Sequence, residues 1–210
     1  MAARTWSAAE KFKSNMKIKT RTVVPLLAAL TLIVATVSDA HNPGGKLDPM
    51  NASLESLKGA DFEHSFLQQM IQHHRSGIEM AKLASAQTTR TELRDFTAKM
   101  IATQQQEIDK MSGWLKSWYN VSPKEVANEA ADKEMKMHMS MFSGKRDADF
   151  DKAFLEMTPK HHHAGVEMAE QAEKKATHPE LKEFAAKLAK DQKQEMKQMK
   201  EWAQSWFGPA

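Results

Sequence analysis

A double-histidine motif occurs twice in this chain and constrains the fold more than any other feature of the sequence. The first copy, residues 70–81, reads MIQHHRSGIEMA, and the second, residues 158–169, reads TPKHHHAGVEMA. The longer segments around them, 61–119 and 149–207, align without a gap, and 24 of the 59 aligned positions are identical. Self-similarity at a fixed offset of 88 residues indicates an internal duplication.

The composition is dominated by helix formers, and Tyr, a residue favoured in strands, occurs once. We therefore predict that each copy folds as a helical hairpin. The predicted helices span 61–86 and 90–119 in the first copy, and 149–175 and 178–207 in the second. Thr89 with Glu92, and Thr177 with Glu180, have the spacing of capping boxes that open the second helix of each hairpin. We therefore predict an all-α protein, a four-helix bundle built from two duplicated hairpins.

The second helix of each hairpin has a stripe of residues at spacings of three and four that we expect to be buried. The stripes contain Leu93, Phe96, Met100, Thr103, Glu107, Met111, Trp114 and Trp118, and Leu181, Phe184, Leu188, Asp191, Glu195, Met199, Trp202 and Trp206. Glu107 and Glu195 interrupt the two stripes at equivalent positions. A buried carboxylate is costly unless it is paired or binds a metal. The hairpin geometry brings these carboxylates to the level of the histidines.

The first forty residues have the pattern of a secretory signal peptide. Basic residues precede the apolar run Val23–Val37, and small residues precede a cleavage site after Ala40. Met16 would open a more typical leader than Met1, and an uncleaved membrane anchor is the alternative. We expect an extracytoplasmic, periplasmic protein.

The charge balance changes when this leader is removed. Residues 1–40 hold six of the 30 basic and two of the 27 acidic side chains, so 24 basic and 25 acidic side chains remain, with a net charge of −1. No basic footprint for nucleic acid is left. The chain has no Cys, so any soft-metal ligands must be Met and His.

Two further segments complete the predicted organisation. Residues 41–60 predict a flexible linker and a short helix that begins at Asp48-Pro49. Residues 120–148 predict a Met-rich linker helix that begins at Ser122-Pro123. This helix contains Met135, Met137, His138, Met139 and Met141. If it is helical, Met135, His138 and Met139 share one side and Met137 and Met141 another, so at least one group is expected to be exposed or to bind something.

Imidazole and thioether groups that lie together on an inward helix face form a soft-metal ligand set. The candidate ligands in the two repeats are His73, His74, Met80 and Glu107, and His161, His162, Met168 and Glu195. The five Met and His residues of the linker helix are a second candidate group. The repeats differ at Pro159, which is expected to kink or restart its helix, so the two sites need not be equivalent.

The duplicated motif resembles that of the ferritin-like domain of unknown function numbered three hundred and five, from Asp61 to Ala81 and again from Asp149 to Ala169. Members of this family include exported copper-binding and copper-resistance proteins of bacteria. The resemblance implies a ferritin-like four-helix bundle that binds copper outside the cytoplasm. Carried over by position, the resemblance implies that His73, His74 and Met80, and likewise His161, His162 and Met168, take part in copper binding.

Three functions are compatible with these patterns. The first is capture of Cu(I), with Cu(II) or Ag(I) also possible, for resistance, storage or delivery to a copper exporter or another periplasmic copper protein. The second is a ferritin-like or haemerythrin-like di-metal protein, although the Glu-x-x-His spacing of ferritin-type di-iron sites does not occur. The third is a metal-free helical adaptor or holdase. No nucleophile–base constellation or phosphate-binding loop is visible, so we expect no enzymatic activity.

Overall fold

Four helices of 29 residues and one shorter helix make up the part of the chain that the computed structural model describes, residues 54–121 and 129–208. They are α1 (Gly59–Gln87), α2 (Thr91–Tyr119), α3 (Glu129–Ser140), α4 (Asp147–Lys175) and α5 (Pro179–Phe207). These residues contain no strand, and the prediction of an all-α fold is confirmed. None of the described helices has the length and apolarity needed to span a membrane. The predicted signal peptide, the helix start at Asp48 and the helix start at Ser122 lie outside the described residues.

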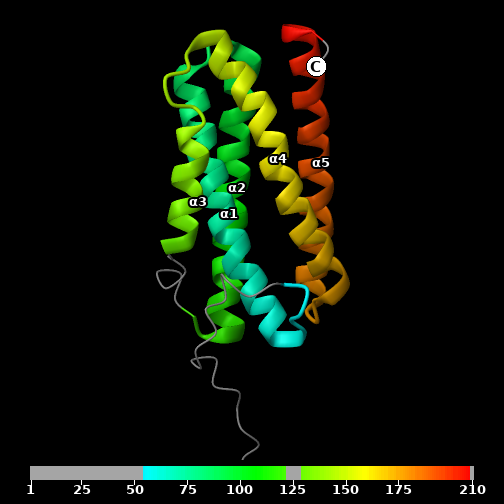
Figure 1. Cartoon of the computed structure of the whole chain (residues 1–210). Coiled ribbons are helices and arrows are strands. Elements are labelled where there is room, and N and C mark those ends of the chain that lie inside the picture. Colours follow the sequence, from blue (N-terminus) through cyan, green and yellow to red (C-terminus); the bar gives the residue numbers. More distant parts are fainter. Residues whose placement is uncertain (1–53, 122–128, 209–210) are drawn as a thin grey trace, which may run out of the picture. The chain divides into compact units, whose positions relative to one another are not determined.

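The long helices form two hairpins that meet through their first helices. Helix α1 packs along α2, α4 packs along α5, and α1 packs against α4 (Figure 1). The short helix α3 lies along α1. Within the described ranges, α2 and α5 have no close backbone contact with each other. The bundle is therefore closed on the α1–α4 side and is joined only by side chains on the α2–α5 side.

The helix starts differ in detail from the predicted capping boxes. Helix α2 has Arg90 as its N-cap and α5 has His178, and neither N-cap side chain bonds the helix start. The Thr177 hydroxyl instead donates a hydrogen bond to Glu63 of α1, 2.9 Å away. The prediction of capping boxes is thus wrong. In the second repeat the Thr177 hydroxyl, which would cap its own helix, forms its hydrogen bond with a residue of the other hairpin.

Helix α4 continues without a break through Pro159, so the predicted restart of this helix is wrong. Proline cannot donate the backbone hydrogen bond to the carbonyl four residues earlier, here that of Leu155. Leu155 and Thr158 are both buried. Packing of this part of α4 therefore holds the helix together despite the missing bond.

The buried apolar side chains form two clusters, one toward each end of the bundle. The first surrounds Phe62, Phe66 and Leu115, and the second surrounds Met80, Phe150 and Phe154. Buried polar side chains lie between them, where the two double-histidine motifs meet. These are His74, Gln104, His161, His162 and Gln192. The core therefore has a polar layer at mid-height.

The buried stripe of α2 is displaced from the predicted one. The buried residues are Leu93, Thr97, Met100, Gln104, Ile108, Met111 and Leu115. The prediction is wrong for five residues that are only partly buried, namely Phe96, Thr103, Glu107, Trp114 and Trp118. The physical reason is that α2 packs on α1 and not on α5, so these residues lie at the edge that faces α5.

Two polar clamps tie each hairpin to the other. In the first, the Glu63 carboxylate accepts hydrogen bonds from the Tyr119 hydroxyl at 2.5 Å and from His178 Nδ1 at 2.7 Å, and Trp118 stacks on His178 with ring centroids 3.8 Å apart. In the second, the Asp151 carboxylate pairs with Arg90. Asp151 is the repeat equivalent of Glu63, and Arg90 is the repeat equivalent of His178.

The second clamp has the same layout as the first. The distance from Arg90 Nε to Asp151 Oδ2 is 3.3 Å, and the Arg90 guanidinium lies 4.2 Å from the ring centroid of Trp206. All three residues lie 88 positions from their counterparts in the first clamp. In each clamp, a buried carboxylate on the first helix of one hairpin pairs with the side chain of the N-cap residue of the second helix of the other hairpin. That N-cap residue is Arg90 for α2 and His178 for α5. The clamps therefore fix how the hairpins meet and position the polar layer.

Candidate metal centre

A pair of stacked histidines lies at the middle of the α1–α4 contact. The rings of His73 from α1 and His161 from α4 are 3.7 Å apart between centroids and 7° from parallel. The Nε2 atom of His73 and both ring nitrogens of His161 are buried and have no hydrogen-bond partner among the described residues. Buried polar atoms without partners are costly, so three such nitrogens in one place point to a ligand.

The second histidine of each motif is held by the glutamate of the neighbouring helix. His74 Nε2 lies 2.7 Å from Glu107 Oε2, and His162 Nε2 lies 2.8 Å from Glu195 Oε2. Both imidazoles are fully buried, and the Nδ1 atom of each has no partner among the described residues. A carboxylate that accepts the N–H of one ring nitrogen leaves the other nitrogen as a lone-pair donor, as in many metal-binding histidines.

This geometry gives Glu107 and Glu195 a more specific role than the sequence suggests. Each was predicted as a metal ligand on a buried stripe. In the structure each fixes the tautomer and orientation of a histidine, and each is partly exposed at the α2–α5 edge. Direct coordination by these carboxylates stays a prediction.

A glycine in each motif makes room for the polar layer. A Cβ atom at Gly165 would lie 2.6 Å from Gln192 Oε1 and 2.8 Å from His73 Nε2. A Cβ atom at Gly77 would lie 2.6 Å from Gln104 Oε1. Gln192 has both amide atoms buried without a partner among the described residues. Gln192 and His73 therefore both approach the space above Gly165 with free polar atoms.

Helix α3 adds a third histidine to the stacked pair. The ring of His138 lies 5.5 Å from that of His161 in an edge-to-face arrangement, and its Nδ1 is 3.3 Å from the Ser76 hydroxyl. The predicted linker helix ends earlier than expected, because α3 stops at Ser140 and Met141 lies in the following turn, but the predicted exposure pattern is confirmed. His138, Met135 and Met139 are partly buried, whereas Met137 and Met141 are 52% and 39% exposed.

The electrostatics of the layer keep the stacked pair uncharged. Burial lowers the pKa of His73 and His161 well below the ordinary value, and the neighbouring histidines lower it further. Neutral imidazoles have free lone pairs, which is the state that binds a metal.

The histidines are not arranged as a ready-made cage. Among the described residues, no three His, Asp or Glu side chains converge in a metal-binding geometry. An imidazole lone pair lies in the plane of its ring, so two nearly parallel stacked rings cannot both point at one ion. Metal binding would have to turn at least one of the two rings.

The predicted methionine ligands of the repeats lie outside this layer. Met80 is fully buried in the apolar cluster around Phe150 and Phe154, and Met168 packs against the other cluster. The structure thus brings together His73, His74, His161, His162 and His138, with Glu107 and Glu195 behind them. Gln192, Gln104 and Ser76 belong to the same layer and were not predicted as site residues, although the two glutamines occupy equivalent positions in the repeats.

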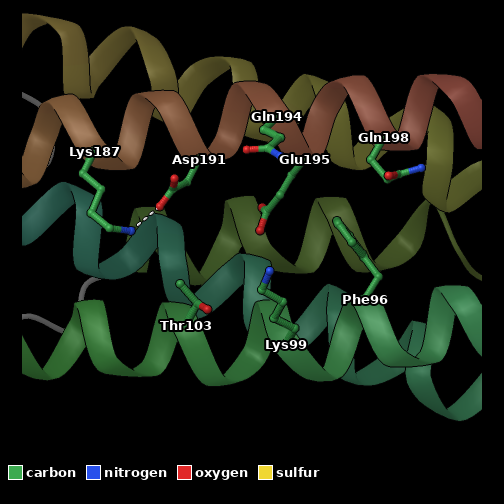
Figure 2. Close-up of a pocket in the computed structure, with 8 residues that line it drawn as sticks. All are labelled: Phe96, Lys99, Thr103, Lys187, Asp191, Gln194, Glu195 and Gln198. Carbon is green, nitrogen blue, oxygen red and sulfur yellow. Dashed lines mark hydrogen bonds and ion pairs between the residues drawn. The ribbon is translucent and has the colours of Figure 1, made fainter.

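A pocket of about 420 Å³ lies between α2 and α5, beside the polar layer. Figure 2 shows Glu195 of α5 and Lys99 of α2 projecting into it from opposite sides, and the ion pair between Lys187 and Asp191 at its rim. The pocket therefore reaches the carboxylate that holds His162. Aromatic contacts also join α2 and α5, between Phe96 and Trp202 and between Trp114 and Phe184.

Comparison with known families and structures gives several matches. The model of a family described as "Domain of unknown function (DUF305)" matches residues 33–115 and 63–203. No curated protein matches the sequence.

Among solved structures, CopM in its Cu(I)-bound form is 27% identical to the chain, with a TM-score of 0.60, and the match covers 70% of this chain and 98% of CopM. CopM soaked with Ag gives the same identity and TM-score, with 70% and 97% covered. A DUF305 protein from Streptomyces coelicolor, described as secreted, is 24% identical with a TM-score of 0.54, over 65% of this chain and 89% of that one, and bears on the fold alone.

Proposed function

This chain belongs to the DUF305 family, and from that premise we propose that it is a copper-binding protein that captures Cu(I), and also Ag(I) or Cu(II), through His and Met side chains. The proposed role is binding for resistance, storage or delivery, without catalysis. The proposed location is outside the cytoplasm, after export by the leader at residues 1–40. A delivery partner would be a copper exporter or another periplasmic copper protein.

The observation that carries this proposal is the set of buried imidazole nitrogens without partners between α1 and α4. His73 and His161 offer nitrogens directly, and His74 and His162 each offer Nδ1 because Nε2 is held by a glutamate. Neutral imidazole binds both oxidation states of copper. A layer that only packed the bundle would gain from partners for these nitrogens or from apolar residues in their place.

The relatives support the choice of metal. Structures of CopM at 26–27% identity are described with Cu(I), Cu(II) and Ag bound. The Met-rich face of α3 adds thioether donors next to the histidines, which favours soft monovalent ions. We propose weaker and exchangeable binding at Met135, Met137, Met139 and Met141, and tighter binding in the histidine layer.

The first test is an anaerobic titration of the chain with Cu(I) in competition with a chromophoric Cu(I) chelator. We expect the chain to compete for more than one copper. His73→Ala combined with His161→Ala should remove the tighter binding while circular dichroism remains helical. Failure of the unchanged chain to compete would contradict the proposal, and bound iron in protein from its own host would favour a di-metal protein.

A matched control is available on the same helix. His163 follows His162 in α4, but its side chain is 63% exposed and lies outside the buried layer. His163→Ala should leave the competition curve unchanged. An equal loss of affinity in His163→Ala and in the double variant would show that the histidines act through surface binding and would contradict the buried site. Replacing the four linker methionines by Leu keeps side-chain volume nearly constant, and it should lower only the copper stoichiometry.

A further inference from the structure

A second pocket, of about 500 Å³, lies where the turn after α3 meets α4. Its lining includes two thioethers, those of Met141 and Met157. Two carboxylates, Asp149 and Glu156, and two lysines, Lys145 and Lys152, complete most of the wall. Because these formal charges cancel, the pocket offers a cation little net attraction, and its distinctive donors are the two sulfur atoms.

Met141 is held against α4 by its neighbour in the chain. Phe142 is 3% exposed, and its ring lies 5.3 Å from that of Phe150 and 6.4 Å from that of Phe154. This anchor fixes the turn that follows α3 (Figure 1). Met141 is therefore presented to the face of α4 that contains Met157, although it is 39% exposed.

Met157 packs at the margin of the apolar cluster around Phe150 and Phe154. The equivalent position in the first repeat, 88 residues earlier, is Gln69, and both side chains are partly buried. The fold therefore accepts a polar residue at this position in one repeat. The Met157 side chain packs on the core and also lines the pocket, where its thioether is available as a donor.

Both methionines lie close to the histidine layer along their own segments. Met157 precedes His161 by four residues on α4, so the two side chains share one face of the helix. Met141 follows His138 by three residues, and the Met141 backbone N–H donates to the His138 carbonyl at 3.1 Å. The rings of His138 and His161 are themselves in contact at 5.5 Å between centroids. Both methionines of the pocket therefore lie within one helical turn of a histidine of the polar layer.

We propose that Met141 and Met157 form a separate site for a soft monovalent cation, Cu(I) or Ag(I), at the outer edge of the histidine layer. The site pairs a methionine of the linker with a methionine of the second repeat. It rests on the proposed function in that both take soft cations, but its donors are two sulfur atoms and its place is at the surface. Thioethers bind hard divalent ions poorly, so Mg²⁺ should not compete.

The test is nuclear magnetic resonance of the full chain with carbon-13-labelled methionine methyl groups, titrated with Ag(I) as a redox-silent probe. We expect the Met141 and Met157 methyl signals to shift together at the same Ag(I) concentration. Met141→Leu should move the midpoint of the Met157 shift at least about tenfold higher, because a chelate becomes a single donor. Met157→Leu should do the same to the Met141 shift.

Met196→Leu is the matched control, because Met196 is on α5, packs against the other apolar cluster and does not line the pocket. It should leave both shifts unchanged. A Met157 signal that stays still, or that shifts equally in Met141→Leu, would overturn this site. If copper competition by the histidine layer persists in that case, the proposed function stands without this site. If Ag(I) moves neither the methionine signals nor the histidine ring signals, both proposals fail.

Discussion

At the scale of single residues, the glycines show how the polar layer is given space. A Cβ atom at Gly113, on the exposed side of α2, would meet nothing within 4 Å. At Gly165 it would meet His73 and Gln192 at less than 3 Å. The same substitution should therefore have opposite consequences at the two positions.

Gly113→Ala should raise the free energy of unfolding by about 1 kcal/mol, because alanine favours the helix and nothing opposes its methyl group. Gly165→Ala should show no such gain and should weaken Ag(I) binding, since the new methyl group displaces the His73 ring. Urea denaturation and Ag(I) titration of both variants measure the two effects. Equal stabilisation in both, with unchanged Ag(I) affinity, would show that the space above Gly165 is not needed.

Glu63 is a single residue whose environment sets a pH dependence. Burial by itself would raise the pKa of Glu63, but hydrogen bonds from Tyr119, His178 and Thr177 outweigh it and lower the pKa to about 2 from an ordinary value of 4.5. A lowered pKa means that the folded state favours the ionised carboxylate. The resulting stability is complete above the ordinary pKa and is lost as the pH falls toward the folded one.

Between about pH 6 and about pH 2, the unchanged chain should lose about 3 kcal/mol more of its unfolding free energy than Glu63→Gln does. The amide keeps the shape of the side chain but does not titrate. Denaturant unfolding at a series of pH values measures this difference. Glu183→Gln, on the exposed surface of α5, is the control. A pH profile of Glu63→Gln that matches the unchanged chain would contradict the assignment.

At the scale of the elements, the two clamps decide how the hairpins meet. Asp151 is 1% exposed, and its pairing partner Arg90 comes from the turn of the other hairpin. By contrast, Lys82 and Glu79 form an ion pair within α1 that is about half exposed. Ion pairs of these two kinds contribute very differently to stability.

Arg90→Ala should lower the free energy of unfolding by about 3 kcal/mol, because it leaves a buried carboxylate without its partner. Lys82→Ala should change it by less than about 0.5 kcal/mol. Thermal or denaturant unfolding compares the two variants. Similar small losses in both would mean that the Asp151 clamp does not hold the hairpins together. Restoration of stability in Arg90→Ala with Asp151→Asn would identify the unpaired charge as the cause.

The elements also show where local patterns are overruled. Pro159 predicts a break, yet α4 runs through it, and the neighbouring side chains of Leu155 and Thr158 are buried. Thr177 predicts a cap, yet its hydroxyl binds Glu63 of the other hairpin. In both cases a contact from a distant segment outweighs a local preference of about 1 to 3 kcal/mol.

At the scale of the whole molecule, the candidate metal centre joins the two hairpins. His73 and His74 lie on α1, and His161 and His162 lie on α4. An ion bound across this contact would stabilise the folded bundle and not the unfolded chain. The coupling between binding and stability therefore tests the location of the site.

A free Ag(I) concentration about 100 times the dissociation constant should stabilise the fold by about 2.7 kcal/mol. Differential scanning calorimetry with and without Ag(I) measures this as a rise in the melting temperature, and a chelator should reverse it. His163→Ala should keep the rise, and the His73→Ala and His161→Ala double variant should lose it. A rise of equal size in the double variant would place the stabilising ion elsewhere.

The duplicated motif and the periodicity of the helices determined the all-α fold and the ends of the long helices to within two residues. They also determined that His73, His74, His161 and His162 lie level with Glu107 and Glu195, because this follows from the rise of a helix and the place of a turn. The spacing of residues along the chain is enough for these predictions, since helix ends and the level of a residue in a hairpin depend only on distance along the chain.

Only the tertiary structure decided which residues at the edge of each predicted stripe are buried, and with them the role of each candidate site residue. Because α2 and α5 do not pack on each other in the described ranges, Glu107 and Glu195 lie at an open edge and hold His74 and His162. The stacking of His73 on His161, and the approach of His138, depend on how α1, α3 and α4 meet. Such contacts join residues far apart in the chain, and helix periodicity has no information about the angle at which two helices pack.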